Sequence, residues 1–276
     1  MNKPSRGLQW AAYLILTAGA LIMLVPFAQM VSTSLMKPGF ELLLPPRFIP
    51  DPVEWSNYKR VWLEINFLRY TANSVFVTVL DLVGMVASCA LVAYGLAFFE
   101  FRGRGLIFLA MLGTMMLPSQ VTMIPTYFIW KEFNLLNSYY PLILRSFLGG
   151  AFGIFLLHQF YKSLPKELYD AAWVDGANPW KIFYKIYLPL TKPALAALAV
   201  FTFISAWNST LEPLIYLKDK HLYTLQLGLL FLRNEVENKT TLIMAGSVIT
   251  LLPVLIVFLF AQKQFVQGVA STGLKG

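Results

Sequence analysis

Long apolar segments separated by shorter polar ones dominate the pattern of this chain. Six of them approach the roughly 20 apolar residues that an α-helix needs to cross the hydrocarbon of a bilayer. These segments run from Trp10 to Val31, Ala72 to Phe99, Leu106 to Trp130, Pro141 to Tyr161, Ala194 to Tyr216 and Thr241 to Ala261. The pattern predicts an all-α membrane protein with six transmembrane helices over residues 10–261, a short N-terminal stub at 1–9 and a polar tail at 262–276.

A secretory signal is the alternative for the first segment, since Lys3 and Arg6 precede it. The apolar core of a signal is about 7 to 15 residues long and leads to a small-residue cleavage site. This run is longer and such a pattern does not follow it, so we expect a helix that stays in the membrane.

Composition supports the membrane assignment, and charge indicates the orientation. Of the 276 residues 57% are hydrophobic and 13% charged, which is too apolar for one soluble core. The basic stub and the short basic turn Phe99–Gly105 place both termini on the cytoplasmic side. The net charge of +8 then suits anionic lipid and partners at that face, and not nucleic acid. The single cysteine, Cys89, excludes a disulfide framework and is expected to pack.

The longest cytoplasmic loop, residues 162–192, contains a stretch that looks like soluble protein, DAAWVDGANPWKIFYKIYLP. We expect a first short helix over Lys166–Asp175, about 15 Å long and so too short to span. Ser163 or Leu164 can cap it, with Pro165 at its first helical position. Gly176 suits the left-handed residue after a helix, and Asn178-Pro179 reads as the cap and start of a second helix.

One side of the first helix is small and smooth. Leu168, Ala171, Ala172 and Asp175 recur at i, i+3, i+4 and i+7. This side suits docking of another protein. Packing of the loop on its own helix bundle explains the same residues equally well.

The spacing of this loop is similar to the EAA motif of ATP-binding-cassette (ABC) importer permeases, which reads E-A-A, three residues, G, nine residues, I, one residue, L-P. The matching residues are Asp170, Ala171, Ala172, Gly176, Ile186, Leu188 and Pro189. Asp170 stands where the motif has Glu, which keeps the charge on a shorter arm. The segments LPPRFIPDPVEWSNYKRVW, TMMLPSQVTMIPTYFI and QFVQGVASTGLKG resemble the carbohydrate branch of these permeases, the MalG/UgpE-like subunit.

The resemblance implies a MetI-like permease subunit of a type I importer for a sugar or oligosaccharide, with glycerol 3-phosphate as the alternative substrate. The implied partners are a second, MalF/UgpA-like permease, two ATP-binding-cassette ATPase subunits and an extracytoplasmic substrate-binding protein. The loop would form the coupling helix that sits in an ATPase cleft, with Asp175 beside the seven motif residues. The tail would contact the ATPases through Gly268, Gly273 and Lys275, and a frayed terminus is the alternative.

We expect no catalytic residue, metal site or bound cofactor in this chain. It has no G-x-x-x-x-G-K-[ST] motif, so ATP and Mg would be held by the partner ATPases. His158 and His221 stand without a ligand cluster. A secondary transporter, a channel or a membrane enzyme would need coupling carboxylates, a filter or a nucleophile, and none of these explains the glycine-hinged loop.

Polar residues inside the apolar segments are candidates for a substrate path, because such groups are costly in lipid. Ser205, Asn208 and Glu212 fall at helical spacing on one face of the fifth segment, and Asp81 is near mid-depth in the second. Thr114 and Gln120 flank Pro118 in the third and suit a neutral polyol. Hydrogen bonding between helices is the alternative role. Gly84, Gly95, Gly113 and Gly153 offer surface for close packing against another bundle or within this one.

Overall fold

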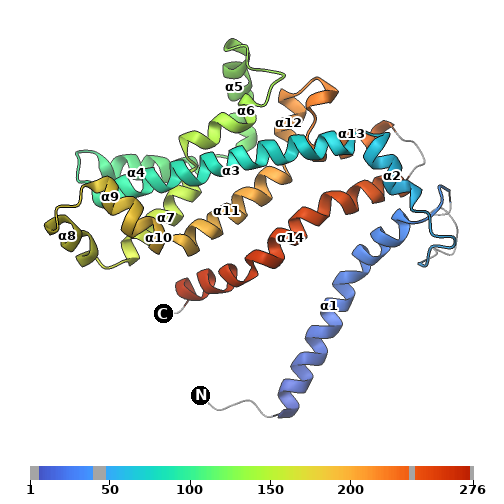
Figure 1. Cartoon of the computed structure of the whole chain (residues 1–276), viewed down its shortest axis with the longest axis horizontal. Helices are drawn as coiled ribbons and strands as arrows, with labels where there is room; N and C mark the ends of the chain where they lie inside the picture. Colours follow the sequence, from blue (N-terminus) through green and yellow to red (C-terminus); the bar gives the residue numbers. More distant parts are fainter. Residues whose placement is uncertain (1–5, 40–47, 236–239, 274–276) are drawn as a thin grey trace. The chain divides into compact units, whose positions relative to one another are not determined.

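The computed structural model describes residues 6–39, 48–235 and 240–273, and within them it contains helices and no strand. The chain divides into two compact units. The first consists of Met1–Leu68 and Leu229–Leu252, and the second of Arg69–Gly228 and Pro253–Gly276. Figure 1 colours the helices in chain order.

The first unit contains α1 (Arg6–Ser34) and α2 (Ser56–Leu63). The apolar side chains of α1 are exposed along most of its 29 residues, as expected of a helix whose solvent is lipid. The buried Asn57 amide of α2 donates to the carbonyls of Ser34 and Met36, at 2.9 and 2.8 Å. These bonds fix α2 to the end of α1.

The second unit contains most of the remaining helices. They are α3 (Phe67–Phe98, with its first two residues in the first unit), α4 (Arg104–Thr114), α5 (Ser119–Glu132), α6 (Tyr140–Ile143), the 3₁₀ turn η2 (Leu144–Leu148), α7 (Ala151–Ser163), α8 (Glu167–Val174), α9 (Pro179–Ile182), the π-helical η3 (Phe183–Tyr187), α10 (Leu188–Leu190), α11 (Lys192–Trp207), α12 (Leu211–Tyr216) and the 3₁₀ turn η4 (Lys220–Leu222). Finally α13 (Leu225–Glu235) and α14 (Thr240–Gly273) belong partly to each unit.

Four continuous stretches are long and apolar enough to cross a membrane: Arg6–Ser34, Phe67–Phe98, Tyr140–Ser163 and Thr240–Gln262. Two bent helix pairs raise the number of candidate spans to six. The all-α membrane fold predicted from the apolar segments is therefore confirmed. The structure adds that the third and fifth predicted spans are interrupted and not continuous helices.

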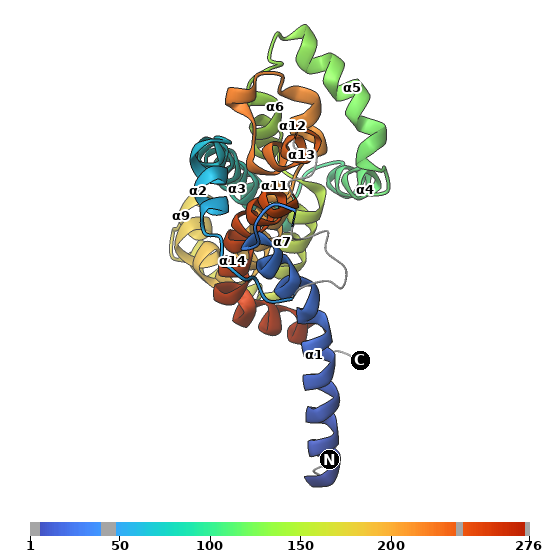
Figure 2. The ribbon, with the colours of Figure 1, turned by 90° about the vertical axis from the view of Figure 1, so that its right-hand side faces the viewer.

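The third predicted span is two helices, α4 and α5, that meet at an angle of 102°. Figure 2 shows that the two helices run in different directions. Pro118 precedes α5 with an extended ψ of 135°. A proline lacks the N–H of a continuous helix and disfavours helical backbone in the residue before it. The chain therefore turns here.

The fifth predicted span also breaks. Helix α11 ends at Trp207, and α12 begins only at Leu211. Pro213 offers no N–H to the carbonyl of Ser209, four residues earlier, so a continuous helix would lose a hydrogen bond and clash there. The residues predicted to form one helical stripe therefore lie on two helices and the break between them.

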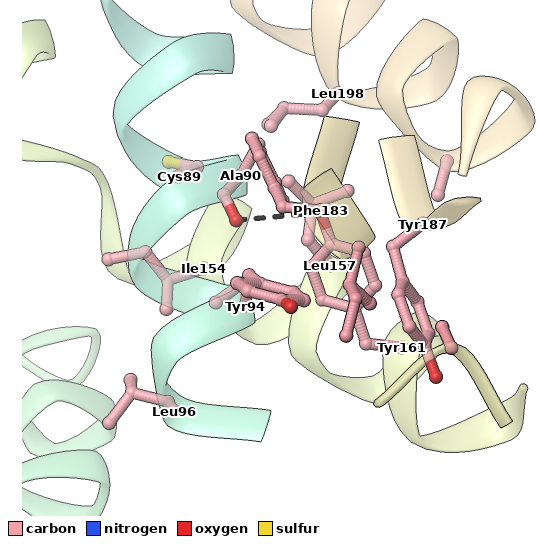
Figure 3. Close-up of a cluster of buried hydrophobic side chains, with 14 residues drawn as sticks. Cys89, Ala90, Tyr94, Leu96, Ile154, Leu157, Tyr161, Phe183, Tyr187 and Leu198 are labelled. Atoms are coloured by element: carbon pink, nitrogen blue, oxygen red, sulfur yellow. Dashed lines mark hydrogen bonds between the residues drawn. The ribbon is translucent and has the colours of Figure 1, made fainter. Parts of the chain in front are cut away.

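The core of the second unit lies where α3, α7, α11 and the loop after α7 meet (Figure 3). Cys89 and Leu157 are fully buried in it, and the Tyr161 hydroxyl donates to the Ala90 carbonyl at 3.4 Å. The expectation that Cys89 packs as a free thiol is confirmed.

Two of the four glycines expected to allow close packing have a role inside this unit. A Cβ on Gly84 would lie 2.6 Å from the Phe147 ring, and one on Gly153 would lie 2.7 Å from the Cys89 sulfur. A Cβ on Gly113 would meet nothing within 4 Å, so this glycine has open space beside it in the described structure. Gly84 and Gly153 thus allow close packing within the bundle.

Candidate functional site

Helix α8 is close to the predicted Lys166–Asp175, shorter by one residue at each end. Glu167 and Asp170 in its first turn favour the positive end of the helix dipole. The predicted cap is wrong. Lys166 occupies the N-cap, and its ammonium group cannot accept a hydrogen bond from the helix N–H groups. Ser163 still belongs to α7 and Leu164 is extended, so neither stands at the N-cap.

The end of α8 agrees with the sequence prediction. Gly176 has a φ of +74°, the left-handed region in which side chains are strained. The N–H of Ala177 donates to the Ala172 carbonyl and that of Gly176 to the Trp173 carbonyl, each at 3.0 Å. This is the Schellman pattern of bonds. The Asn178 side chain then accepts from the N–H of Lys181 at 2.8 Å, so it caps α9.

The small side predicted for α8 is divided between core and solvent. Ala172 is buried in the core of its own unit, whereas Ala171 is exposed. The outer surface also has large apolar side chains that sequence reasoning overlooked: Val174 is 85% exposed and Trp180 65%. The sequence did contain a signal for this exposed surface, namely large apolar residues within a loop that is otherwise rich in charge. We name the exposed set Asp170, Ala171, Trp173, Val174, Asp175 and Trp180 the docking face.

A cluster of aromatic rings fastens this loop to the C-terminal end of α3, where Figure 1 shows α8 and α9. Phe98 stacks on Tyr169 with centroids 5.1 Å apart and planes 3° apart, and it lies 4.3 Å from the Tyr187 ring. The Tyr94 hydroxyl donates to the Pro179 carbonyl at 3.0 Å. We name Tyr94, Phe98, Tyr161, Tyr169, Phe183 and Tyr187 the aromatic anchor.

The remaining motif residues lie beside this anchor. Ile186 and Leu188 are half-buried against the core, and Pro189 is exposed. Burial raises the pKa of the Tyr169 hydroxyl, and the neighbouring Asp170 carboxylate raises it further. Tyr169 is therefore a neutral phenol at physiological pH.

Four of the six residues proposed for the substrate path line one cavity of about 760 Å³ in the second unit: Asp81, Ser205, Asn208 and Glu212. Thr114 and Gln120 are not among its lining residues. Both are exposed, and the Thr114 hydroxyl donates to the Met111 carbonyl of its own helix at 2.6 Å. The break between α11 and α12 thus brings polar residues together that a continuous helix would have spread along one face.

Hydrogen bonds hold the polar groups of this cavity in place. The Asn208 amide donates to the Ile204 carbonyl at 2.9 Å and accepts from the Gln226 amide at 3.0 Å. Arg145, which sequence reasoning did not single out, pairs with Glu212 at 2.7 Å. The hydroxyl of Thr224 is buried and has no hydrogen-bond partner in the described part of the chain.

A family model described as "Binding-protein-dependent transport system inner membrane component" matches residues 82–271, which include the docking face, the aromatic anchor and this cavity. The chain belongs to this family. As such it is a permease subunit of an ABC importer.

Relatives and a solved structure agree with the family. The arabinooligosaccharides transport system permease protein AraQ of Halalkalibacterium halodurans is 32% identical over 282 residues, 100% of this chain and 99% of that protein. The sn-glycerol-3-phosphate transport system permease protein UgpE of Pectobacterium atrosepticum is 32% identical over 280 residues, 99% of each chain. A bacterial ABC transporter involved in the import of the acidic polysaccharide alginate matches with a TM-score of 0.84 and 27% identity, over 95% of this chain and 99% of that one.

The remaining residues considered in the sequence belong to neither the docking face, the aromatic anchor nor the cavity. Gly268 and Gly273 belong to the last turns of α14, and Lys275 falls outside the described residues. His158 stacks on Phe108 with ring centroids 4.3 Å apart, and His221 bonds to Arg69 at 2.9 Å. Within the described ranges, three or more His, Cys, Asp or Glu residues nowhere gather closely enough to hold a metal ion.

Proposed function

We propose that this permease imports a carbohydrate and forms the translocation path with a second, homologous permease. The name of its relative AraQ supports this substrate class, since it describes the transport of arabino-oligosaccharides. A cavity of about 760 Å³ is also within the range of roughly 300 to 1,000 Å³ that is usual for small-molecule sites. Glycerol 3-phosphate, named for another relative, is the alternative substrate.

Two ATPase subunits and an extracytoplasmic substrate-binding protein complete the proposed assembly. ATP and Mg bind to the ATPases, which carry out the hydrolysis. The observation that carries this proposal is α8 itself, a rigidly ended helix whose docking face exposes large apolar side chains between two carboxylates. Such a face suits a soluble partner with an apolar cleft and a basic rim.

Both termini lie on the cytoplasmic side in this proposal, together with the loop at 162–192. The basic stub and the basic turn before α4 support that orientation. The tail beyond residue 262 then enters the cytoplasm, where Gly268, Gly273 and Lys275 reach the ATPases.

The aromatic anchor gives the coupling loop a route to the membrane helices. When ATP binding closes the ATPases, the docking face moves with them. The anchor passes this movement to α3 because Phe98 packs against both Tyr169 and Tyr187. The bundle then rocks and alternates access to the cavity.

Replacing Asp170 tests the docking face. Asp170→Lys should leave the exposed position folded but repel a basic cleft, so ATP hydrolysis stimulated by binding protein and saccharide should fall about tenfold. The purified complex in proteoliposomes is the material, and ATPase rate and uptake are the measurements. Asp170→Glu, which restores the residue of the motif, is the matched control and should behave like the wild type. Normal stimulation and uptake in Asp170→Lys would overturn the proposal.

A further inference from the structure

The cavity in the second unit contains three ionisable side chains among the described residues that line it: Asp81 of α3, Arg145 of η2 and Glu212 of α12. Arg145 and Glu212 lie 2.7 Å apart and form an ion pair. Arg145 and Glu212 also act electrostatically on the Asp81 carboxyl, so the three groups form one charge cluster.

This cluster has no excess of positive charge. It contains one guanidinium and two carboxyl groups. The net charge of the cluster is therefore zero if Asp81 is protonated and −1 if Asp81 is ionised. An anionic ligand is best recognised by an arginine whose planar N–H groups are available. Here the positive charge of Arg145 is already compensated by the Glu212 carboxylate, and an anion that entered would face the carboxylates as well.

Neutral hydrogen-bonding groups line the same cavity. Ser205 is exposed and lines it, and a serine hydroxyl can donate one hydrogen bond and accept others. Asn208 is held by Ile204 and Gln226, which leaves one N–H and one carbonyl lone pair of its amide for a ligand. A saccharide hydroxyl both donates and accepts, so it can pair with either group.

We propose that the Arg145–Glu212 pair sets the charge selectivity of this permease, so that the cavity accepts neutral saccharides and rejects uronates and phosphorylated polyols. This inference rests on the proposed import function and narrows its substrate class. Family membership leaves the charge open, because the similar proteins include one named for glycerol 3-phosphate and one for an acidic polysaccharide. Glu212 acts here as a specificity-determining residue by compensating the positive charge of the guanidinium.

Equilibrium binding to the permease complex in nanodiscs, without the substrate-binding protein, tests this directly. Saturation-transfer NMR would compare xylotriose, a neutral trisaccharide, with trigalacturonate, its anionic counterpart. The wild-type complex should favour xylotriose about tenfold or more. Glu212→Gln keeps the shape but releases Arg145, so the ratio should shift about tenfold towards trigalacturonate, which corresponds to the loss of one close charge interaction.

Two control variants make the result specific. The double variant Arg145→Gln/Glu212→Gln removes both charges and should not gain trigalacturonate binding. Glu64→Gln alters the Arg60–Glu64 pair, whose residues do not line this cavity, and should match the wild type.

Three results would overturn the inference: wild-type binding of trigalacturonate as tight as that of xylotriose, equal gains in the single and double variants, or no gain in a Glu212→Gln complex that melts like the wild type. Binding needs no turnover. If binding protein and saccharide do not stimulate ATP hydrolysis by the complex, that result counts against the proposed import function. The ratio of xylotriose to trigalacturonate binding still decides the charge selectivity.

Discussion

A single backbone conformation determines how the coupling loop turns after α8. Gly176 adopts a φ of +74°, and an added Cβ there would meet nothing within 4 Å. The requirement for glycine is therefore one of backbone strain and not of space. The two Schellman bonds place Asn178 where it caps α9. One residue thus sets the angle between the two short helices of the loop.

Gly176→Val should test this strain. Valine resists a positive φ, so the variant should lose about 1 to 2 kcal/mol locally and shift the end of α8. We expect uptake and stimulated ATP hydrolysis to fall together while the complex still assembles. Gly176→Asn is the matched control, because asparagine tolerates the left-handed region and the site has room. Equal activity in both variants and the wild type would show that the turn is not strained.

At the scale of elements, α8 moves with α3 only if the rings between them stay packed. Phe98 contacts Tyr169 and Tyr187, and Tyr169 in turn stacks on Trp173 of the docking face at 6.2 Å. Removal of Phe98 therefore leaves only the longer ring contacts that run from Tyr94 of α3 through Tyr187 to Tyr169. Phe98 makes the shortest of the ring contacts between α3 and the loop, 4.3 Å to Tyr187.

Phe98→Ala should loosen the loop from α3, at a cost of about 3 kcal/mol for a half-buried core aromatic. ATP hydrolysis should continue with weak dependence on saccharide, while uptake falls more steeply. Tyr184→Ala changes a residue of the same loop that is 52% exposed, so it is the control and should keep the two activities linked. If Phe98→Ala lowers hydrolysis and uptake in the same proportion, the anchor serves stability and not transmission.

Local signals predicted the elements of the loop better than the faces of its helices. Gly176 and Asn178 are local: their conformation depends on neighbours in the sequence, and their predicted roles are confirmed. Ala171 and Ala172 are adjacent and equally small, so only tertiary packing decides that Ala172 is buried and Ala171 exposed. Proline at 118 was visible in the sequence, but the angle of 102° depends on what packs around it.

At the scale of the whole molecule, the cavity depends on breaks that hydropathy does not reveal. Arg145 follows α6 in a 3₁₀ turn, and Glu212 follows the break after α11. Their pairing joins residues 67 positions apart in the chain, which no periodic pattern specifies. Apolar segments therefore predicted the spans, whereas the cavity required the structure.

Asn208 connects this cavity to the stability of the helices around it. Its amide bonds both to Ile204 at the end of α11 and to Gln226 of α13, so Asn208→Leu removes two hydrogen bonds at about 1 kcal/mol each. We expect a lower melting temperature together with a loss of uptake that exceeds the loss of ATP hydrolysis, because the amide also faces the cavity. Gln226→Leu separates the roles: it removes the same bond to Asn208 from a residue that does not line the cavity. Matching losses of uptake in the two variants would assign Asn208 to helix packing alone, whereas a larger loss in Asn208→Leu would place its amide in contact with the transported saccharide.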